Sequence, residues 1–119
     1  MNKFPFPHKK LDVYNVALDM AVKTKDLAVH IPRGYRSFAD QLLRAAGSTV
    51  LLIAEGANRY SAGSKRQRYS EARGECGEVA AAVELLDAMQ LVPSQKAREI
   101  LALAGRVGAM LSRLLSRLS

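Results

Sequence analysis

The sequence has 119 residues, enough for one domain with a core of its own. Hydrophobic residues make up 49% of it, which excludes an intrinsically disordered chain. Lys and Arg total 18 while Asp and Glu total 11, so the formal net charge is +7. Such an excess favours acidic partners: nucleic acid, an anionic membrane surface or an acidic protein.

Cysteine content and apolar runs bear on the cellular compartment. Cys76 is the single cysteine, which excludes an intramolecular disulfide and a thiolate metal cluster and favours a reducing cytoplasm. The first residues contain no apolar run of signal-peptide length. The longest nearly apolar stretch, residues 45–54, is about half of the ~20 residues that a membrane span needs. We therefore expect a cytoplasmic protein with no membrane partner.

The hydrophobic pattern is helical from Leu11 onward. Residues 1–10 are expected to form an extended basic arm, and the first helical run stops before Pro32. Ser37 is a suitable N-cap for the second helix, and Ser64 with Gln67 forms a capping box for the third. The pattern predicts four helices, over residues 10–31, 37–58, 64–91 and 94–118.

The connections between these helices determine the expected architecture. The turns near residues 31–36 and 92–94 are short, so consecutive helices should be antiparallel neighbours. No alternating Val/Ile/Thr-rich segment predicts a strand. We predict a single all-α domain over residues 1–119, an antiparallel up-down-up-down four-helix bundle.

The second predicted helix lacks the usual polar face. Residues 45–54 carry no charge, and the apolar run from Val50 to Ile53 points to every side of a helix. Either this helix is unusually buried within the monomer, or its outer side packs against another subunit. We favour the second interpretation, which predicts a homo-oligomer.

Few residues here are suited to catalysis. The histidines, His8 and His30, belong to no Glu-x-x-His pair or His-Glu-x-x-His zinc motif, and no phosphate-binding glycine loop is present. Cys76 lies on the apolar side of the third helix, where a core cysteine is the simpler interpretation than a nucleophile. We expect no catalytic residue, no metal site and no cofactor.

The basic residues are better organised. Cations gather at the start of the third helix, where they either bind an anion or form a solvated turn, and arginines form a stripe along the fourth. We expect Glu71, Glu75 and Glu78 to neutralise Arg106 and Arg113 across the hairpin of the last two helices. The remaining surplus is the candidate nucleic-acid site, namely Lys65, Arg66, Arg68, Arg98 and Arg117, with the N-terminal lysines.

Glu55 lies in an apolar neighbourhood near the end of the second helix. A buried carboxylate needs a charged or hydrogen-bonding partner, and Arg44, Arg59 or Gln41 could supply one. We predict a structural ion pair of Glu55 with Arg44 or Arg59.

Several ordered segments also resemble a known family. They are Leu11-Asp-Val-Tyr14, Pro32, Gln41-Leu-Leu-Arg-Ala-Ala46 with Ser48, Ile53-Ala-Glu-Gly56 with Arg59 and Ser61, and Ala72-Arg-Gly74 with Glu78. This set is similar to the bacterial four-helix-bundle proteins named for 23S rRNA intervening sequences. The chain departs from the family pattern at Leu52, where Asn is usual, and at Glu75, where Ser is usual.

The resemblance implies a four-helix bundle assembled into a ring-like homopentamer. Relatives in diversity-generating retroelements are basic pentamers that bind nucleic acid and a reverse transcriptase, whereas for most members the resemblance implies no biochemical activity. We therefore expect a non-enzymatic basic oligomeric adaptor that binds RNA or DNA, with a protein partner as a second expected ligand. The alternative is a protein-interaction scaffold whose charge only maintains solubility.

Overall fold

The computed structural model describes residues 6–118, and every regular element among them is helical. Four long helices account for most of this part of the chain, with no strand among the described residues, as the sequence predicts. A short 3-10 helix precedes each of the first two long helices. The elements in chain order are η1 (Pro7–Lys10), α1 (Asp12–Ala28), η2 (Arg33–Tyr35), α2 (Arg36–Asn58), α3 (Ala62–Ala88) and α4 (Ser94–Leu118).

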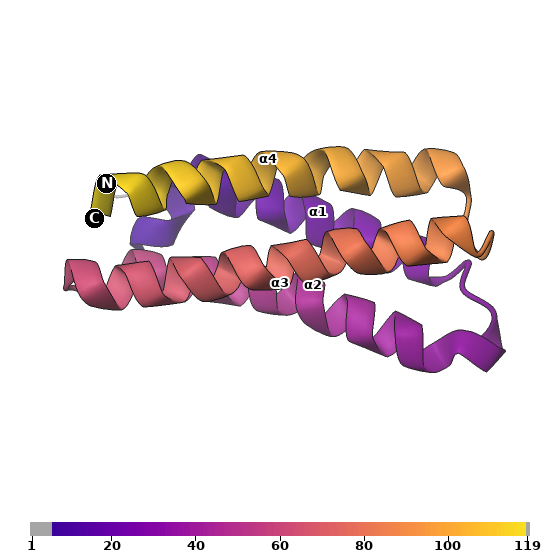
Figure 1. The fold of residues 1–119 in the computed structure, drawn as a ribbon. Helices are drawn as coiled ribbons and strands as arrows, with labels where there is room; N and C mark the ends of the chain where they lie inside the picture. The colour runs from indigo at the N-terminus through magenta and orange to yellow at the C-terminus, as the bar shows by residue number, and fades with distance from the viewer. Residues whose placement is uncertain (1–5, 119) are drawn as a thin grey trace.

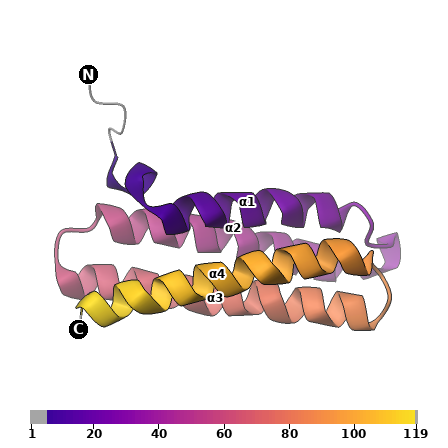
Figure 2. The ribbon, with the colours of Figure 1, turned by 90° about the horizontal axis from the view of Figure 1, so that it is seen from above.

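The four helices pack as an antiparallel bundle (Figure 1). Each helix contacts the helices before and after it, and α1 also contacts α4, which closes the arrangement. Helices α2 and α4 make no contact with each other within residues 6–118, so they occupy opposite corners. The start of α1 and the end of α4 lie at the same end of the bundle (Figure 2).

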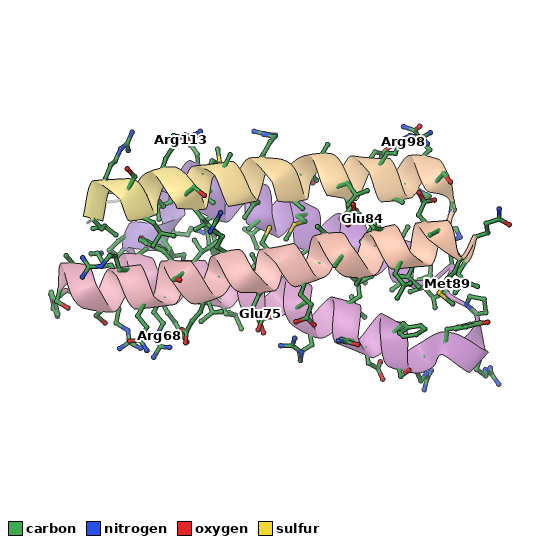
Figure 3. All side chains as sticks on the ribbon, in the orientation of Figure 1. Arg68, Glu75, Glu84, Met89, Arg98 and Arg113 are labelled. Carbon is green, nitrogen blue, oxygen red and sulfur yellow. The ribbon has the colours of Figure 1, made fainter. Side chains whose placement is uncertain are left out.

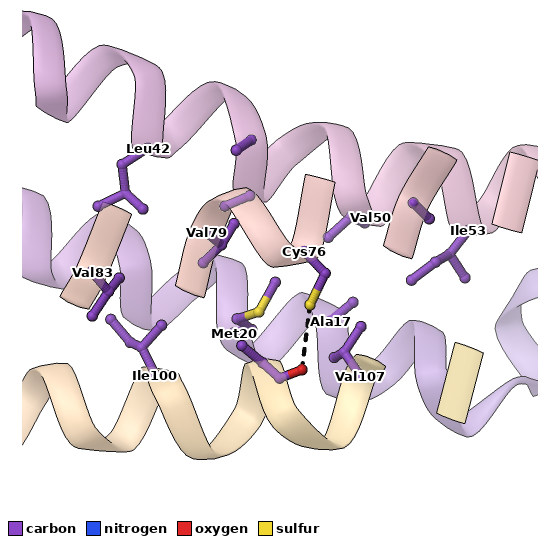
Figure 4. Close-up of a cluster of buried hydrophobic side chains, with 14 of the residues drawn as sticks. Ala17, Met20, Leu42, Val50, Ile53, Cys76, Val79, Val83, Ile100 and Val107 are labelled. Atoms are coloured by element: carbon purple, nitrogen blue, oxygen red, sulfur yellow. Dashed lines mark hydrogen bonds between the residues drawn. The ribbon is translucent and has the colours of Figure 1, made fainter. Parts of the chain in front are cut away.

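One continuous core joins all four helices (Figure 4). Met20, Ile53, Val79 and Ile100 contribute one fully or almost fully buried side chain from each helix. Burial of each such side chain stabilises the fold by roughly 1.5–3 kcal/mol. On α3 and α4 the positions predicted by helical spacing form this core. On α1 the spacing that runs from Leu11 through Leu18 and Val22 predicts the wrong face, because Leu18 and Val22 are exposed. The core side of α1 is formed by Val13, Ala17, Met20 and Leu27.

The N-terminal segment differs from the extended arm that the sequence predicts. Residues 7–10 form a 3-10 turn that starts at Pro7, whose fixed φ suits the first position of a helix. The ring of His8 packs edge-on against Tyr14, and its Nδ1 lies 2.9 Å from Nδ2 of Asn58. These contacts hold η1 against α1 and α2. Lys3 lies outside the described residues.

The helix ends also differ from the predicted ones by a few residues. Ser61, not Ser64, caps α3, because its hydroxyl accepts a hydrogen bond from the Ser64 backbone N–H at 3.1 Å. At the other end α3 stops at Ala88, and Gln90 adopts a positive φ of 60° in the turn before α4. Local turn chemistry therefore sets the boundaries.

Several large apolar side chains remain exposed on α1 and α2. Leu51 is 65% exposed and Val22 is 58% exposed, while the other side of each helix is buried in the core. The uncharged segment of α2 is therefore not enclosed within the monomer. The exposed apolar set on these two helices, here called the α1–α2 apolar face, is Leu18, Val22, Val29, Leu43 and Leu51.

Candidate nucleic-acid interface

Charge is distributed unevenly among the helices. Helix α4 carries five Lys and Arg and one Glu, a net charge of +4. Helices α1, α2 and α3 together carry eight Lys and Arg and ten Asp and Glu. The positive charge of the described helices is therefore concentrated on α4.

The arginines of α4 project into solvent. Arg106, Arg113 and Arg117 are exposed, and within residues 6–118 none of them lies within 4.0 Å of a carboxylate. Figure 3 shows Arg98 and Arg113 on the side of α4 away from α3. Arg98 donates a hydrogen bond to Oε1 of Gln95 at 3.0 Å. This row, here called the α4 basic face, can accept anions without first breaking an ion pair.

Three predicted binding residues at the start of α3 instead have partners within the chain. Lys65 Nζ donates to the carbonyls of Gly56 at 3.3 Å and Ala57 at 2.9 Å, so it satisfies free carbonyl groups at the end of α2. Arg66 donates to the carbonyl of Leu118 at the end of α4. These two cations therefore tie helix ends together.

Arg68 is the third of these residues and is not part of a charge surplus. It lies 2.7 Å from Glu71 and 3.5 Å from Glu55, and hydrogen bonding to Glu71 raises the pKa of the guanidinium. Of the five predicted residues, only Arg98 and Arg117 belong to the α4 basic face. They stand 19 residues apart, roughly 28 Å along the helix.

The predicted ion pair of Glu55 with Arg44 or Arg59 is wrong. Glu55 pairs with Arg68, and its side chain is 49% exposed, so it is not a buried carboxylate. Arg44 points to α3 and pairs with Glu75 at 3.1 Å and with Glu78 at 2.9 Å. Arg59 follows the end of α2 and forms no ion pair with any described residue.

Glu75 and Glu78 of α3 face α2, not α4 as the sequence analysis predicted, whereas Glu71 pairs with Arg68 of its own helix and Glu84 lines the seam with α4. Glu75 and Glu78 hold Arg44, and hydrogen bonds to both carboxylates raise its pKa. The seam between α3 and α4 is instead lined by small residues, including Gly77 and Gly105. Arg106 and Arg113 are therefore left without the partners assigned to them, and they enlarge the surplus on α4.

Sequence reasoning included Lys10 and Arg117 in the basic surplus but missed Arg113 and the convergence of the three cations. Lys10, Arg113 and Arg117 line one pocket between the start of α1 and the end of α4. Two signals were available: Arg113 and Arg117 are four residues apart on one helix face, and an up-down-up-down bundle brings both chain ends together. Assigning Arg113 to a glutamate of α3 hid this convergence.

Chemistry beyond charge is sparse among residues 6–118. Burial raises the pKa of the Cys76 thiol from 9.0 to about 11, and the thiol donates to the carbonyl of Ala104 at 3.3 Å (Figure 4). That environment disfavours the reactive thiolate. No group of three or more His, Cys, Asp or Glu in this part of the chain could hold a metal ion. None of the described helices is both long and apolar enough to cross a membrane.

Comparison with known proteins identifies the family. The family model described as 23S rRNA-intervening sequence protein matches residues 9–113. The chain belongs to this family. No curated protein matches it.

A solved structure supports the fold of this 23S rRNA-intervening sequence protein family member. It is a protein of unknown function from the S23 ribosomal protein family of Bacteroides thetaiotaomicron VPI-5482. The TM-score is 0.80 at 19% sequence identity, and the match covers 87% of this chain and 95% of that chain. At this identity the likeness shows the shared four-helix architecture.

The structure explains the segment Ile53-Ala-Glu-Gly56, which carried much of the resemblance to the family. Ile53 is fully buried in the core, and Glu55 pairs with Arg68 of α3. A Cβ atom at Gly56 would lie only 2.6 Å from Cε1 of Tyr69. Gly56 therefore provides the space in which the buried Tyr69 ring packs against the backbone of α2.

Proposed function

We propose that this protein is a non-enzymatic, self-associating basic adaptor that binds RNA or DNA through the α4 basic face. The single observation that carries the proposal is the concentration of charge on α4, a net +4 on a helix whose outer arginines have no carboxylate partner within residues 6–118. Arginines in such a row bind backbone phosphates and release condensed counterions. Membership of a family named for an rRNA element agrees with this assignment.

Self-association is the second part of the proposal. The α1–α2 apolar face exposes large side chains. Val29 and Leu43 line the same hollow of about 420 Å³ between the two helices, whose lining also includes the charged Lys25, Arg33, Arg36 and Asp40. Exposed apolar surface of this kind marks protein–protein contacts. The resemblance described above implies that the assembly is a ring-like homopentamer.

The two surfaces are compatible in one assembly. The helix that carries Leu43 and Leu51 occupies the corner of the bundle opposite α4, whereas α1, which carries Leu18 and Val22, contacts α4 and turns these two side chains away from the core. A subunit contact built on the α1–α2 apolar face therefore leaves the α4 basic face open to solvent. Several such faces on one oligomer would act together on a single strand and raise the apparent affinity.

Direct binding tests the proposed function. Fluorescence anisotropy of a labelled single-stranded RNA and a labelled duplex DNA at low salt should show saturable binding by the wild-type protein. The variant with Arg106→Gln, Arg113→Gln and Arg117→Gln should bind at least about tenfold more weakly, since each lost phosphate contact removes a counterion-release term.

A matched control removes the same charge elsewhere. Arg33→Gln, Arg36→Gln and Arg59→Gln change three exposed arginines that lie off α4. Because Arg33 and Arg36 line the hollow between α1 and α2, sedimentation equilibrium must show the same mass for this variant as for the wild type. This control variant should keep most of the wild-type affinity. Absence of wild-type binding at low salt would overturn the adaptor assignment and favour the protein-interaction scaffold, whose binding surface would be the α1–α2 apolar face.

A further inference from the structure

A pocket of about 310 Å³ lies where the start of α1 meets the end of α4. Its ionisable lining residues are Lys10, Asp12, Arg113 and Arg117, and apolar side chains of both helices form the remaining wall. Figures 1 and 2 show that these two chain segments share one end of the bundle. The pocket is therefore formed by residues about a hundred positions apart in the sequence.

The pocket carries an excess of two positive charges. Three cations face one carboxylate, and within residues 6–118 none of the three cations lies within 4.0 Å of a carboxylate. Arg113 and Arg117 are also four residues apart on one helix, where like charges repel each other. An anion in the pocket would relieve this repulsion.

Asp12 does not cancel the excess. It lies in the first turn of α1, where the helix dipole stabilises a negative side chain. Its charge is therefore partly engaged by its own helix. Its negative charge should still weaken the binding of an anion in the pocket. Removal of the Asp12 charge should therefore tighten anion binding, whereas removal of an arginine should weaken it.

The chemistry of these groups selects a phosphate. A guanidinium presents paired N–H donors that match two phosphate oxygens, and two guanidinium groups with one ammonium can contact several oxygens of one tetrahedral group. We propose that this pocket binds one phosphate group. The source of the phosphate rests on the proposed function: it belongs to the backbone of the bound nucleic acid.

The experiment uses inorganic phosphate as the probe, so that it does not depend on nucleic-acid binding. The full chain labelled with ¹⁵N is titrated with phosphate, with the ionic strength held constant by chloride, and amide shifts are followed by NMR. Saturable shifts should concentrate at residues 10–13 and 110–117. The variant with Arg113→Gln and Arg117→Gln should weaken phosphate binding at least about tenfold, because two charge-assisted contacts are lost.

Two controls separate a pocket from general attraction. Arg98→Gln with Arg106→Gln removes the same charge from the same helix outside the pocket and should change the dissociation constant less than about twofold. Asp12→Asn should tighten phosphate binding. Non-saturating shifts spread over all basic residues, or equal weakening by the two arginine pairs, would overturn the assignment of the pocket.

The outcomes also distinguish this inference from the proposed function. Saturable phosphate binding in a protein that binds neither RNA nor DNA would support the pocket and refute the adaptor role. Nucleic-acid binding without localised phosphate binding would refute the pocket and leave the adaptor role in place. With both correct, Arg113→Gln and Arg117→Gln together should weaken nucleic-acid binding more than Arg98→Gln and Arg106→Gln together.

Discussion

Gly56 gives the sharpest test of the packing between α2 and α3. An alanine Cβ at this position would lie 2.6 Å from Cε1, 2.7 Å from Cδ1 and 3.2 Å from Cζ of Tyr69. The Tyr69 ring is only 3% exposed, so it has little room to move away. Overpacking of this kind costs typically about 1–3 kcal/mol, and the higher helix propensity of alanine returns up to ~1 kcal/mol. Gly56→Ala should therefore destabilise the protein by about 1–2 kcal/mol.

The assay is urea unfolding followed by circular dichroism at one fixed protein concentration, because self-association would make stability concentration-dependent. Gly74→Ala is the matched control, since nothing lies within 4 Å of a Cβ there, and it should stabilise by about 0.5–1 kcal/mol. In a Tyr69→Leu background the cost of alanine at position 56 should shrink. If Gly56→Ala is as stable as Gly74→Ala, the packing argument is wrong.

Three further predictions follow from the same structure. Glu55→Ala should shift the urea midpoint less than Gly56→Ala, because the Glu55 side chain is 49% exposed and its contact with the partly buried Arg68 is 3.5 Å long; an equal shift would contradict that placement. The Cys76 thiol should react slowly with a disulfide reagent at pH 8 until urea unfolds the chain. Since burial raises the pKa of this thiol from 9.0 to about 11 in the folded protein, its contribution to the free energy of unfolding should be lost as pH rises from 9 to 11. Leu51→Glu should reduce the mass in sedimentation equilibrium towards the 13.0 kDa of the monomer without loss of helicity, whereas Leu85→Glu on α3 should leave the mass unchanged. A Leu51→Glu oligomer of unchanged size would exclude the α1–α2 apolar face as the subunit contact.

Helix content, and the core positions of α3 and α4, could be predicted from the sequence because both depend on local periodicity, whereas on α1 the exposed Leu18 and Val22 obscured the buried face. Val79 and Val83 on α3, and Ile100 and Val107 on α4, follow the spacing of one buried helix face, and all four are buried. Helix ends were less predictable. Ser61 and Ser64 are both acceptable N-caps, and the choice depends on where the preceding loop places the chain.

The ion pairs could not be predicted from spacing alone. Glu71, Glu75 and Glu78 lie to one side of the buried face of α3, and their partners depend on whether α2 or α4 lies on that side. That choice depends on the handedness of the bundle, which helical spacing does not specify. The structure places α2 there, so Arg44 takes Glu75 and Glu78, and the arginines of α4 remain free.

The candidate site was therefore only partly predictable. Arg98 and Arg117 have no ion pair within residues 6–118 and remain candidates, but Lys65, Arg66 and Arg68 have partners that only the packed structure reveals. The pocket formed by Lys10, Arg113 and Arg117 joins both ends of the chain. Contacts of such long sequence separation leave no periodic signal, although the topology of the bundle allows them.

The salt dependence of nucleic-acid binding tests the central claim most directly. Four phosphate contacts, by Arg98, Arg106, Arg113 and Arg117 of the α4 basic face, should give a slope of log affinity against log salt concentration of about −3 to −4 per engaged subunit, at −0.7 to −0.9 per contact. Changing Arg106, Arg113 and Arg117 to Gln should make the slope shallower by about 2 to 3. A wild-type protein that does not bind at low salt, or a slope that these changes leave unaltered, would contradict the assignment of function to the α4 basic face.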